Sequence, residues 1–397
     1  METEIKYIDN LCVKITDGSH FSPEDDEKGQ YPMYSVKDME YNSFSNQDCK
    51  HIGQDVFDKL SRQDCRPLKD DIVIAKDGSY LKYVFKVKED LDACILSSIA
   101  ILRPNKKVID PDYFVYLMRS ASVKNAMANY VSGSALPRII LSDFKKMKIA
   151  ICSDLNKQKH IASILSAYDS QIENNQKRIK LLEQMAENLY KEWFVRFRFP
   201  GYENAEFEGG VPKGWVSLVG DNKKPKGWTY GELNQLGTFI RGKNITAAEM
   251  IEGQVPVISA GLEPAGYHNQ ANVCGPCLTI SSSGANAGYL KYNLTDIWAA
   301  DCSYYNNPDN IWFVYSSLKY LQPVISNLQC GAAQPHVYPK DVNRLCVILP
   351  PKSLITEYNR QSSLFFKNIH NLKNQIFLLT HQRDLLLPRL MSGKLSI

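Results

Sequence analysis

One pair of cysteines has the spacing of a redox site. Cys274 and Cys277 enclose a Gly-Pro dipeptide, the pattern with which thioredoxin-type enzymes exchange disulfides. That chemistry needs the first cysteine at the N-terminus of a helix, where the helix dipole lowers the pKa of the thiol. The residues that follow, 278–281, have the sequence Leu-Thr-Ile-Ser, which is typical of a strand. We therefore interpret the motif as a turn before a strand and keep a thiol oxidoreductase as the least favoured alternative.

Patterns for other enzyme chemistry are missing from the sequence. No Walker A pattern occurs, and no glycine-rich fingerprint follows an expected strand. Asn-Pro-Asp-Asn at 307–310 resembles the Asn-Pro-Pro-Tyr motif of amino-methyltransferases, but it lacks the second proline and the aromatic residue that stacks on the base. A second cysteine pair that could complete a four-ligand zinc site is also missing. We expect no catalysis, no cofactor and no metal in this chain.

Composition limits the class of protein. With 397 residues, the chain has room for two or three domains. Its formal net charge is only +4, so binding of a polyanion must come from local basic patches. The N-terminal residues lack the apolar run of a secretory signal, and no stretch of about 18 apolar residues could span a membrane. The ten cysteines are scattered, which is typical of reduced thiols. We expect a cytoplasmic protein with no membrane contact.

The sequence repeats itself at about half its length. Short matches in the same order link the halves: 133–137 with 331–335, 114–116 with 313–315, 80–83 with 289–292, Pro32 with Pro256, and Gly18 with Gly242. The offset falls from 224 residues at Gly18 to 198 residues at 133–137, so the second copy is shorter by about 26 residues between Pro32 and 114–116. The period is too long for a solenoid. It predicts two similar modules that differ most in their N-terminal parts.

A long stretch of helical periodicity closes each half. Apolar and aromatic residues recur at steps of four and three residues, which is the pattern of a coiled-coil seam. The predicted seam consists of Ile161, Leu165, Tyr168, Ile172, Asn175, Ile179, Leu182 and Leu189 in the first stretch, and of Phe365, Ile369, Leu372, Ile376, Leu379, Leu386 and Leu390 in the second. A helix over 155–196 would be about 60 Å long. We expect the two helices to pair antiparallel, with ordinary amphipathic core helices as the alternative.

These patterns predict an α+β protein with a pseudo-twofold internal repeat. Two mixed α/β modules are separated by two long helices that form an antiparallel coiled coil. Short apolar runs predict strands at 72–75, 94–102, 146–152, 277–281 and 344–349, and helical spacing predicts helices over 112–130 and 310–329. The expected boundaries are 1–152 for the first module, 153–198 for the first long helix, 199–227 for an irregular linker, 228–350 for the second module and 351–397 for the second long helix.

Three stretches resemble the specificity subunits of type I restriction–modification systems. They lie at 133–139 leading into 155–161, at the helix end 189–194, and at 383–395. The resemblance covers the whole chain in architecture. It implies a non-catalytic subunit whose two modules are target-recognition domains, each reading one half of a bipartite, asymmetric double-stranded DNA sequence. It also implies that methyltransferase subunits and motor–nuclease subunits dock on the chain, so that S-adenosylmethionine, ATP and Mg belong to those partners.

Under this resemblance, polar residues in glycine-containing turns become candidates for DNA contacts. Polar side chains on loops read base edges, while Lys and Arg hold phosphates. The candidates are Ser19, His20, Lys37, Lys76, Ser79, Tyr80 and Arg138 in the first module, and Arg241, Lys243, Asn244, Ser283, Asn286, Lys291 and His336 in the second. The alternative for each is a solvated surface residue or a turn former. For the whole chain, the alternative function is a protein-assembly scaffold whose modules do not read DNA.

Overall fold

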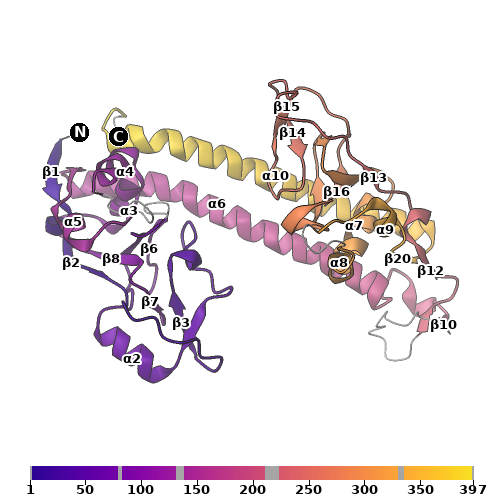
Figure 1. Ribbon diagram of the computed structural model, residues 1–397, viewed down its shortest axis with the longest axis horizontal. Helices are drawn as coiled ribbons and strands as arrows, with labels where there is room; N and C mark the ends of the chain where they lie inside the picture. Colours follow the sequence, from indigo (N-terminus) through magenta and orange to yellow (C-terminus); the bar gives the residue numbers. More distant parts are fainter. Residues whose placement is uncertain (1, 79–82, 131–137, 211–222, 330–334, 396–397) are drawn as a thin grey trace. The chain divides into compact units, whose positions relative to one another are not determined.

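The computed structural model describes residues 2–78, 83–130, 138–210, 223–329 and 335–395 (Figure 1). Contacts within the chain divide it into two compact units. Unit 1 comprises Met1–Asn174 with Ile376–Ile397, and unit 2 comprises Asn175–Gln375. Each unit holds one globular module and a part of each long helix. Among the described residues, no helix is both long enough and apolar enough to cross a membrane.

A four-stranded sheet forms the centre of the module in unit 1. Its neighbouring strands are antiparallel and stand in the order β2 (Cys12–Asp17), β8 (Ile99–Pro104), β5 (Ile72–Ala75) and β6 (Val84–Lys86). A three-stranded sheet has the order β4 (Lys50–Ile52), β3 (Tyr31–Tyr34) and β7 (Cys94–Ile95), and β1 (Thr3–Tyr7) pairs with β9 (Lys148–Cys152). The helices are α1 (Ile8–Leu11), α2 (Gln54–Arg62), α3 (Pro111–Arg119), α4 (Ala121–Ala128) and α5 (Leu141–Lys146).

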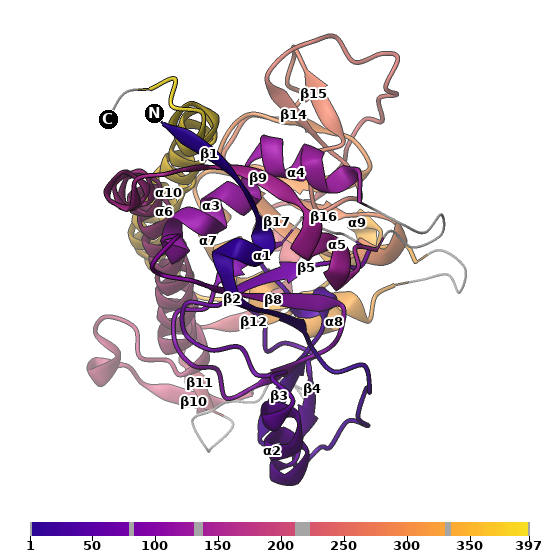
Figure 2. The ribbon, with the colours of Figure 1, turned by 90° about the vertical axis from the view of Figure 1, so that its left-hand side faces the viewer.

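Both faces of this central sheet are covered. Ile72 and Ile74 of β5 belong to a core with residues of α3, α4 and α5, whereas Val73 and Ala75 belong to a second core with residues of β3 and the segment after it. Figure 2 shows α3, α4 and α5 on one side of β2 and β8, and β3 and β4 on the other. Successive side chains of a strand point to opposite faces. A strand covered on both sides therefore needs apolar residues at every position, which explains why β5 is apolar throughout.

The module in unit 2 repeats this strand order. Its central sheet runs β13 (Ile240–Arg241), β19 (Cys302–Tyr305), β16 (Cys277–Ser281) and β17 (Leu290–Asn293). The three-stranded sheet runs β15 (Gly266–His268), β14 (Val255–Ile258) and β18 (Trp298–Ala299), and β12 (Thr229–Glu232) pairs with β20 (Cys346–Leu349). The helices are α7 (Ile311–Tyr320), α8 (Gln322–Ser326) and α9 (Pro339–Asn343). The predicted internal repeat of mixed α/β modules is confirmed as a repeat of topology.

The sheet register corrects one part of the repeat seen in the sequence. The amide of Ala75 donates to the carbonyl of Tyr83, and the amide of Ser281 donates to the carbonyl of Tyr289. Tyr83 therefore corresponds to Tyr289, whereas the sequence match had paired it with Tyr292. Hydrogen bonds between strands fix which residues are equivalent, so the sequence match places Tyr83 three residues out of register.

Three predicted elements are each split in the structure. The helix expected over 112–130 breaks at Ser120, whose backbone is extended (φ −65°, ψ 148°) and whose side chain accepts the amide of Val123 as the N-cap of α4. The helix expected over 310–329 breaks at Leu321, before the proline of α8. The strand expected over 94–102 divides into β7 and β8, because the chain turns between two sheets there.

The two long helices are present in both units and pair antiparallel. They are α6 (Leu155–Tyr190), which continues into a π-helical turn over Lys191–Val195, and α10 (Lys352–Met391). In unit 1, Ile161 and Leu165 near the start of α6 share a core with Leu390 near the end of α10. In unit 2, Ala186 near the end of α6 shares a core with Phe366 of the earlier half of α10. The predicted antiparallel pairing is confirmed.

The residues of the predicted seam lie inward to different degrees. Asn175 sits in the seam, where its side-chain amide donates to Gln375 Oε1 at 3.2 Å. The fully buried members are Ile161, Leu165, Ile172, Asn175, Ile369, Leu372 and Leu390. The half-buried members are Tyr168, Ile179, Leu182, Leu189, Phe365, Ile376, Leu379 and Leu386.

The segment expected to be an irregular linker contains a short antiparallel pair. Strands β10 (Phe207–Gly209) and β11 (Lys223–Pro225) pair with each other. Trp228, directly after β11, is buried, with its ring centroid 6.0 Å from that of Phe194 and 4.9 Å from that of Phe199. The tryptophan thus packs on the end of the first long helix and closes the start of the second module against it.

Candidate nucleic-acid interface

Charged side chains meet where β2 and β5 end in unit 1. Lys76 Nζ lies 3.4 Å from Asp17 Oδ2 and 3.4 Å from Asp77 Oδ1. Arg138 Nε donates to Asp77 Oδ1 at 3.1 Å, and His20 Nε2 lies 3.4 Å from Asp17 Oδ1. The side chain of Lys76 is 2% exposed, whereas those of Arg138 and His20 are 46% and 71% exposed. Lys76 is therefore an internal cation that holds two carboxylates, while Arg138 and His20 form the outer surface.

The same backbone framework recurs in unit 2. In unit 1, Asp77 and Arg138 form an isolated antiparallel bridge, and the amide of Ile139 donates to the carbonyl of Lys76 at 3.0 Å. In unit 2, Ser283 and His336 form the corresponding bridge. There the amide of Val337 donates to the carbonyl of Ser282, also at 3.0 Å.

Glycines support the framework at equivalent places. A Cβ at Gly18 would lie 2.1 Å from the carbonyl oxygen of Ile95, and one at Gly242 would lie 2.5 Å from that of Ala299. Such separations leave no room for any side chain, so both turns require glycine. The sequence match between Gly18 and Gly242 thus marks a real structural equivalence, at which the chain leaves the central sheet close to a neighbouring strand.

The charges carried by this framework differ between the units. Arg241, at the position of Asp17, forms an ion pair with Asp301. Ser283, at the position of Asp77, donates to the same carboxylate of Asp301. Asp301 precedes β19 as Ser98 precedes β8. The end of β2 thus carries an anion, and the equivalent end of β13 carries a cation.

In the cluster of unit 2, which comprises Arg241, Ser283, Asp301 and His336, the histidine stacks on an aromatic side chain. The ring of His336 stacks on Tyr338 with centroids 6.1 Å apart and planes inclined by 22°. His336 is half-buried, and Arg241 is 43% exposed. Two equivalent clusters therefore present different sets of donors and acceptors, as two readers of different base sequences require.

Two of the predicted contact residues are buried. Ser19 is 6% exposed, and its Oγ donates to the carbonyl of Phe21 at 2.6 Å and accepts the amide of Phe21 at 3.1 Å. Lys76 is turned inward by its two carboxylates, as described above. Direct contact with a ligand conflicts with this burial, because neither polar group faces solvent. We revise the role of both residues to shaping the turn from which their neighbours project.

In the described part of the chain, the remaining predicted residues take no part in the hydrogen bonds and ion pairs of the clusters, and they differ in exposure. Lys37 is exposed and donates to the carbonyl of Asp48 at 3.2 Å. Lys243 and Asn244 are exposed after Gly242, and the carbonyl of Lys243 accepts Trp298 Nε1 at 2.8 Å. Lys291 donates to the carbonyl of Leu262 at 3.0 Å, and Asn286 is half-buried at the end of a 3₁₀ turn. Ser79 and Tyr80 lie outside the described residues.

Sequence reasoning missed the carboxylates that organise both clusters. Asp17 and Asp77 each stand directly before a glycine of a predicted contact turn. That adjacency was the available signal for both residues. Asp301 had no comparable signal, because its partners Arg241 and Ser283 come from other strands.

The structure contradicts the redox alternative at the cysteine pair. Cys277 begins strand β16 and is fully buried. Because the motif leads into a strand, Cys274 does not stand at the N-terminus of a helix, where disulfide exchange needs the first thiol. Among the described residues, no group of three or more His, Cys, Asp or Glu side chains is placed to hold a metal ion.

Comparison with known proteins identifies the family. A family model described as the type I restriction modification DNA specificity domain matches residues 2–184 and 225–383. The chain belongs to this family. Its two matched stretches coincide with the two modules and parts of the long helices that follow them, so the specificity domain occurs twice. The resemblance on which the sequence-based prediction of function depended is thereby confirmed.

Individual relatives agree with this assignment to the specificity-domain family. The type I restriction enzyme MjaIX specificity subunit of Methanocaldococcus jannaschii is 27% identical over 303 residues, which cover 72% of this chain and 69% of that protein. The type I restriction enzyme HindI specificity subunit of Haemophilus influenzae is 25% identical over 396 residues, which cover 79% of this chain and 84% of that protein. The crystal structure of an S subunit from M. genitalium has the same fold, with a TM-score of 0.64 at 20% identity over 98% of this chain and 96% of that chain.

Proposed function

We propose that this chain selects the DNA target of a type I restriction–modification complex and that each module reads one half of a bipartite, asymmetric site. The observation that carries the proposal is the pair of equivalent clusters. Arg138 and His20 project from the first, and Arg241 and His336 from the second. A shared backbone with different exposed donors suits two half-sites of different sequence.

The long helices support a spacer role. Helix α6 has 36 residues, which gives it a length of about 54 Å. Half-sites on one face of B-DNA repeat every turn, about 34 Å. A helix of this length exceeds one turn, and helices paired through an apolar seam keep a constant length. We propose that they set the number of base pairs between the half-sites.

The partners and their cofactors belong to the same proposal. Relatives of this chain are named as subunits of type I restriction enzymes. We propose that methyltransferase subunits and motor–nuclease subunits dock on this chain in the cytoplasm. S-adenosylmethionine, ATP and Mg then serve those partners, and this chain contributes recognition of double-stranded DNA.

Methylated-motif sequencing tests the proposal directly. The chain is expressed with its methyltransferase subunit, and genomic DNA is sequenced for methylated sites. Arg138→Ala with His20→Ala should relax the motif in one half only, and Arg241→Ala with His336→Ala should relax it in the other half only. Lys352→Ala, at the start of α10, is the matched control and should leave the motif unchanged. Relaxation of both halves by one pair of substitutions would contradict the assignment of modules to half-sites.

Salt dependence separates DNA reading from the scaffold alternative. Contacts between Lys or Arg and phosphates make the affinity for duplex DNA fall steeply as salt rises. The complex with the methyltransferase subunit should therefore lose affinity for a duplex containing the motif between low and moderate salt. Association that is absent, or that does not respond to salt, would favour a scaffold that does not read DNA.

A further inference from the structure

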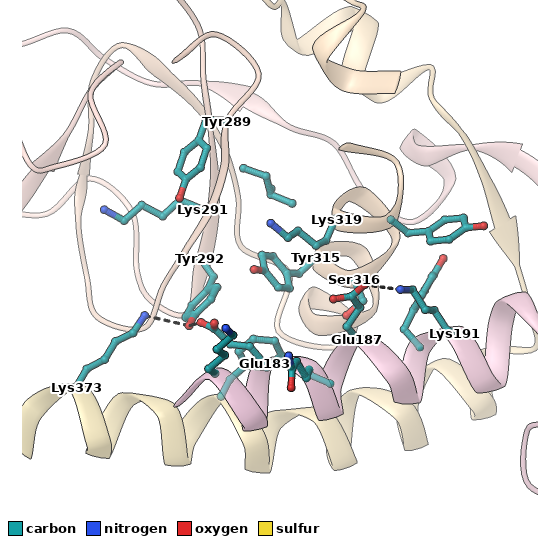
Figure 3. A pocket seen from close by; sticks show the side chains of 17 residues that line it. Glu183, Glu187, Lys191, Tyr289, Lys291, Tyr292, Tyr315, Ser316, Lys319 and Lys373 are labelled. Carbon is teal, nitrogen blue, oxygen red and sulfur yellow. Dashed lines mark hydrogen bonds and ion pairs between the residues drawn. The ribbon is translucent and has the colours of Figure 1, made fainter. Parts of the chain in front are cut away.

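Unit 2 contains a pocket that the DNA-reading clusters do not use. It lies between α6, β17, α7 and α10 and has a volume of about 420 Å³, within the usual range for ligand sites (Figure 3). Its apolar surface comes from Ala186, Tyr292, Tyr315 and Phe366. The ring of Phe366 meets that of Tyr292 edge-on at 5.0 Å and that of Tyr315 at 5.4 Å.

Lysines dominate the charge of this pocket. Lys180, Lys191, Lys291, Lys319 and Lys373 line it, against the two carboxylates of Glu183 and Glu187. Lys373 Nζ donates to the Tyr292 hydroxyl at 3.1 Å and lies 4.8 Å from the centre of its ring, and the same hydroxyl donates to Glu183 at 3.4 Å (Figure 3). Lys191 forms an ion pair with Glu187. The pocket thus combines aromatic walls with an excess of positive charge.

The internal repeat identifies the same place in unit 1. The 197-residue offset of the long helices places Asp169 at Phe366 and Ala186 at Arg383, and the 199-residue offset of the module helices places Tyr116 at Tyr315. In unit 1 these positions touch one another as their counterparts do. The Tyr116 hydroxyl donates to Asp169 Oδ2 at 2.8 Å, and Arg383 Nη1 donates to Asp169 Oδ1 at 2.6 Å.

In unit 1 this place is covered by a loop of the chain itself. The Tyr41 ring centre lies 4.9 Å from Arg383 Cζ and 4.2 Å from Arg119 Cζ. Asn42 follows it inward, donating to Glu173 Oε1 at 3.0 Å and accepting from Arg119 Nη2 at 2.8 Å. Tyr41, which remains 44% exposed, therefore covers the unit 1 site with its ring against two cations.

Unit 2 has no equivalent loop in its described residues. In unit 1, the connection from β3 to β4 covers 35–49 and carries Tyr41, whereas in unit 2 the corresponding connection from β14 to β15 covers only 259–265. This difference is part of the shortening seen in the second half of the sequence. The shorter connection leaves out the segment that covers the site in unit 1, which accounts for the open pocket in unit 2.

We propose that the unit 2 pocket binds an aromatic side chain with acidic neighbours, presented by another protein subunit of the assembly. In unit 1, Glu40 directly precedes Tyr41, so the internal occupant carries a carboxylate next to its aromatic ring. An aromatic ring beside lysines gains cation–π attraction, and acidic neighbours complement the excess positive charge. The proposal rests on the proposed function only in naming an assembly partner as the source of the segment.

Peptide binding tests the chemistry of the occupant. The probe is a fluorescein-labelled peptide with the sequence of residues 38–43, Asp-Met-Glu-Tyr-Asn-Ser, titrated with the full chain by fluorescence anisotropy. We expect saturable binding that weakens by about tenfold when the peptide tyrosine is replaced by alanine, or when the chain carries Lys180→Glu with Lys319→Glu. Lys177→Glu with Lys352→Glu changes the net charge equally outside the pocket and should have no effect. Absence of saturable binding, or equal binding of the alanine peptide, would overturn the proposal.

Photo-crosslinking tests the source of the occupant. The crosslinking residue p-benzoylphenylalanine replaces Lys319 in the chain assembled with its methyltransferase subunit, and mass spectrometry identifies the crosslinked peptide. We expect a segment with Tyr or Phe beside Asp or Glu. Crosslinks only to segments without this pattern would reject the partner. Duplex binding is measured in parallel: peptide binding without DNA binding defeats the proposed function alone, and DNA binding without peptide binding defeats this inference alone.

Discussion

Asp169 and Arg383 form a buried ion pair between α6 and α10, with Arg383 Nη1 2.6 Å from Asp169 Oδ1. The two side chains are 10% and 8% exposed. Asp169 is also bonded to the Tyr116 hydroxyl, and Arg119 Nη1 lies 3.4 Å from it. A carboxylate withdrawn from water needs such a full set of donors. The pairing with Asp169 therefore explains why an arginine is buried in the second long helix.

The counterpart of this pair in unit 2 is apolar. Phe366 stands 197 residues after Asp169, and Ala186 stands 197 residues before Arg383. Both belong to one apolar core. A buried ion pair stabilises a fold about as much as an apolar layer of similar volume. Replacing only one of its partners is destabilising, because the other charge then stays buried without a partner. The equivalent layers are thus apolar in unit 2 and charged in unit 1. In unit 1, Asp169 of α6 bonds both to Arg383 of α10 and to residues of α3.

Removing one partner of the ion pair should destabilise unit 1 strongly. Asp169→Ala leaves Arg383 buried without its carboxylate, so we expect the free energy of unfolding to fall by about 3–5 kcal/mol. The double variant Asp169→Phe with Arg383→Ala copies the layer of unit 2 and should recover most of the loss. Urea unfolding followed by circular dichroism measures both variants. A loss below about 1 kcal/mol in the single variant would mean that solvent already screens the pair.

Gly18 and Gly242, which begin the turns after β2 and β13, should be required for the stability of the fold. A Cβ at Gly18 would lie 2.1 Å from a backbone oxygen, so Gly18→Ala must displace β7 or the turn, at a cost of about 1–3 kcal/mol or more. Gly242→Ala should act likewise in unit 2. Gly209→Ala is the control, because nothing lies within 4 Å of the added carbon there. Thermal unfolding compares the three variants, and an unchanged melting temperature for Gly18→Ala would count against the described turn.

The parts of the fold that follow one local rule could be predicted from the sequence. The long helices repeat the same spacing over many turns, and the half-length repeat preserves glycines that a turn demands. The site could be predicted only in outline. Several of its candidates lie near strand ends, but the inward direction of Lys76 depends on Asp17 and Asp77 together. Asp17 and Lys76 lie on strands that β8 separates, so their proximity is a property of sheet order.

Cysteine labelling should distinguish the two thiols of the Cys-Gly-Pro-Cys motif. Cys274 is exposed, whereas Cys277 is buried with its pKa raised to about 12 by burial. At pH 8 to 9 the native chain should therefore react with iodoacetamide at Cys274 and not at Cys277, because the thiolate is the reacting form. Mass spectrometry of the digested chain locates the label. The unfolded chain is the control, in which both cysteines should react. Labelling of Cys277 in the native chain would contradict its burial at the start of β16.

The two clusters carry different charges at equivalent positions. A substitution of Asp301 should therefore affect recognition of the second half-site alone. Asp301→Asn removes the partner of Arg241 and one acceptor of Ser283, while nothing in unit 1 changes. The freed guanidinium should bind phosphate without regard to sequence. Affinity for unrelated duplex should then rise with a steeper dependence on salt, while discrimination in the second half-site falls by about tenfold.

The matched variant in unit 1 gives this prediction its control. Asp77→Asn removes the ion pair between Asp77 and Arg138, so it should degrade discrimination in the first half-site and leave the second intact. Competition between labelled motif duplex and duplexes altered in one half, repeated at two salt concentrations, measures both variants. Equal damage to both half-sites from either substitution would show that the carboxylates act through overall charge. If each substitution lowers discrimination in a different half-site, each carboxylate must restrain the arginine of its own module.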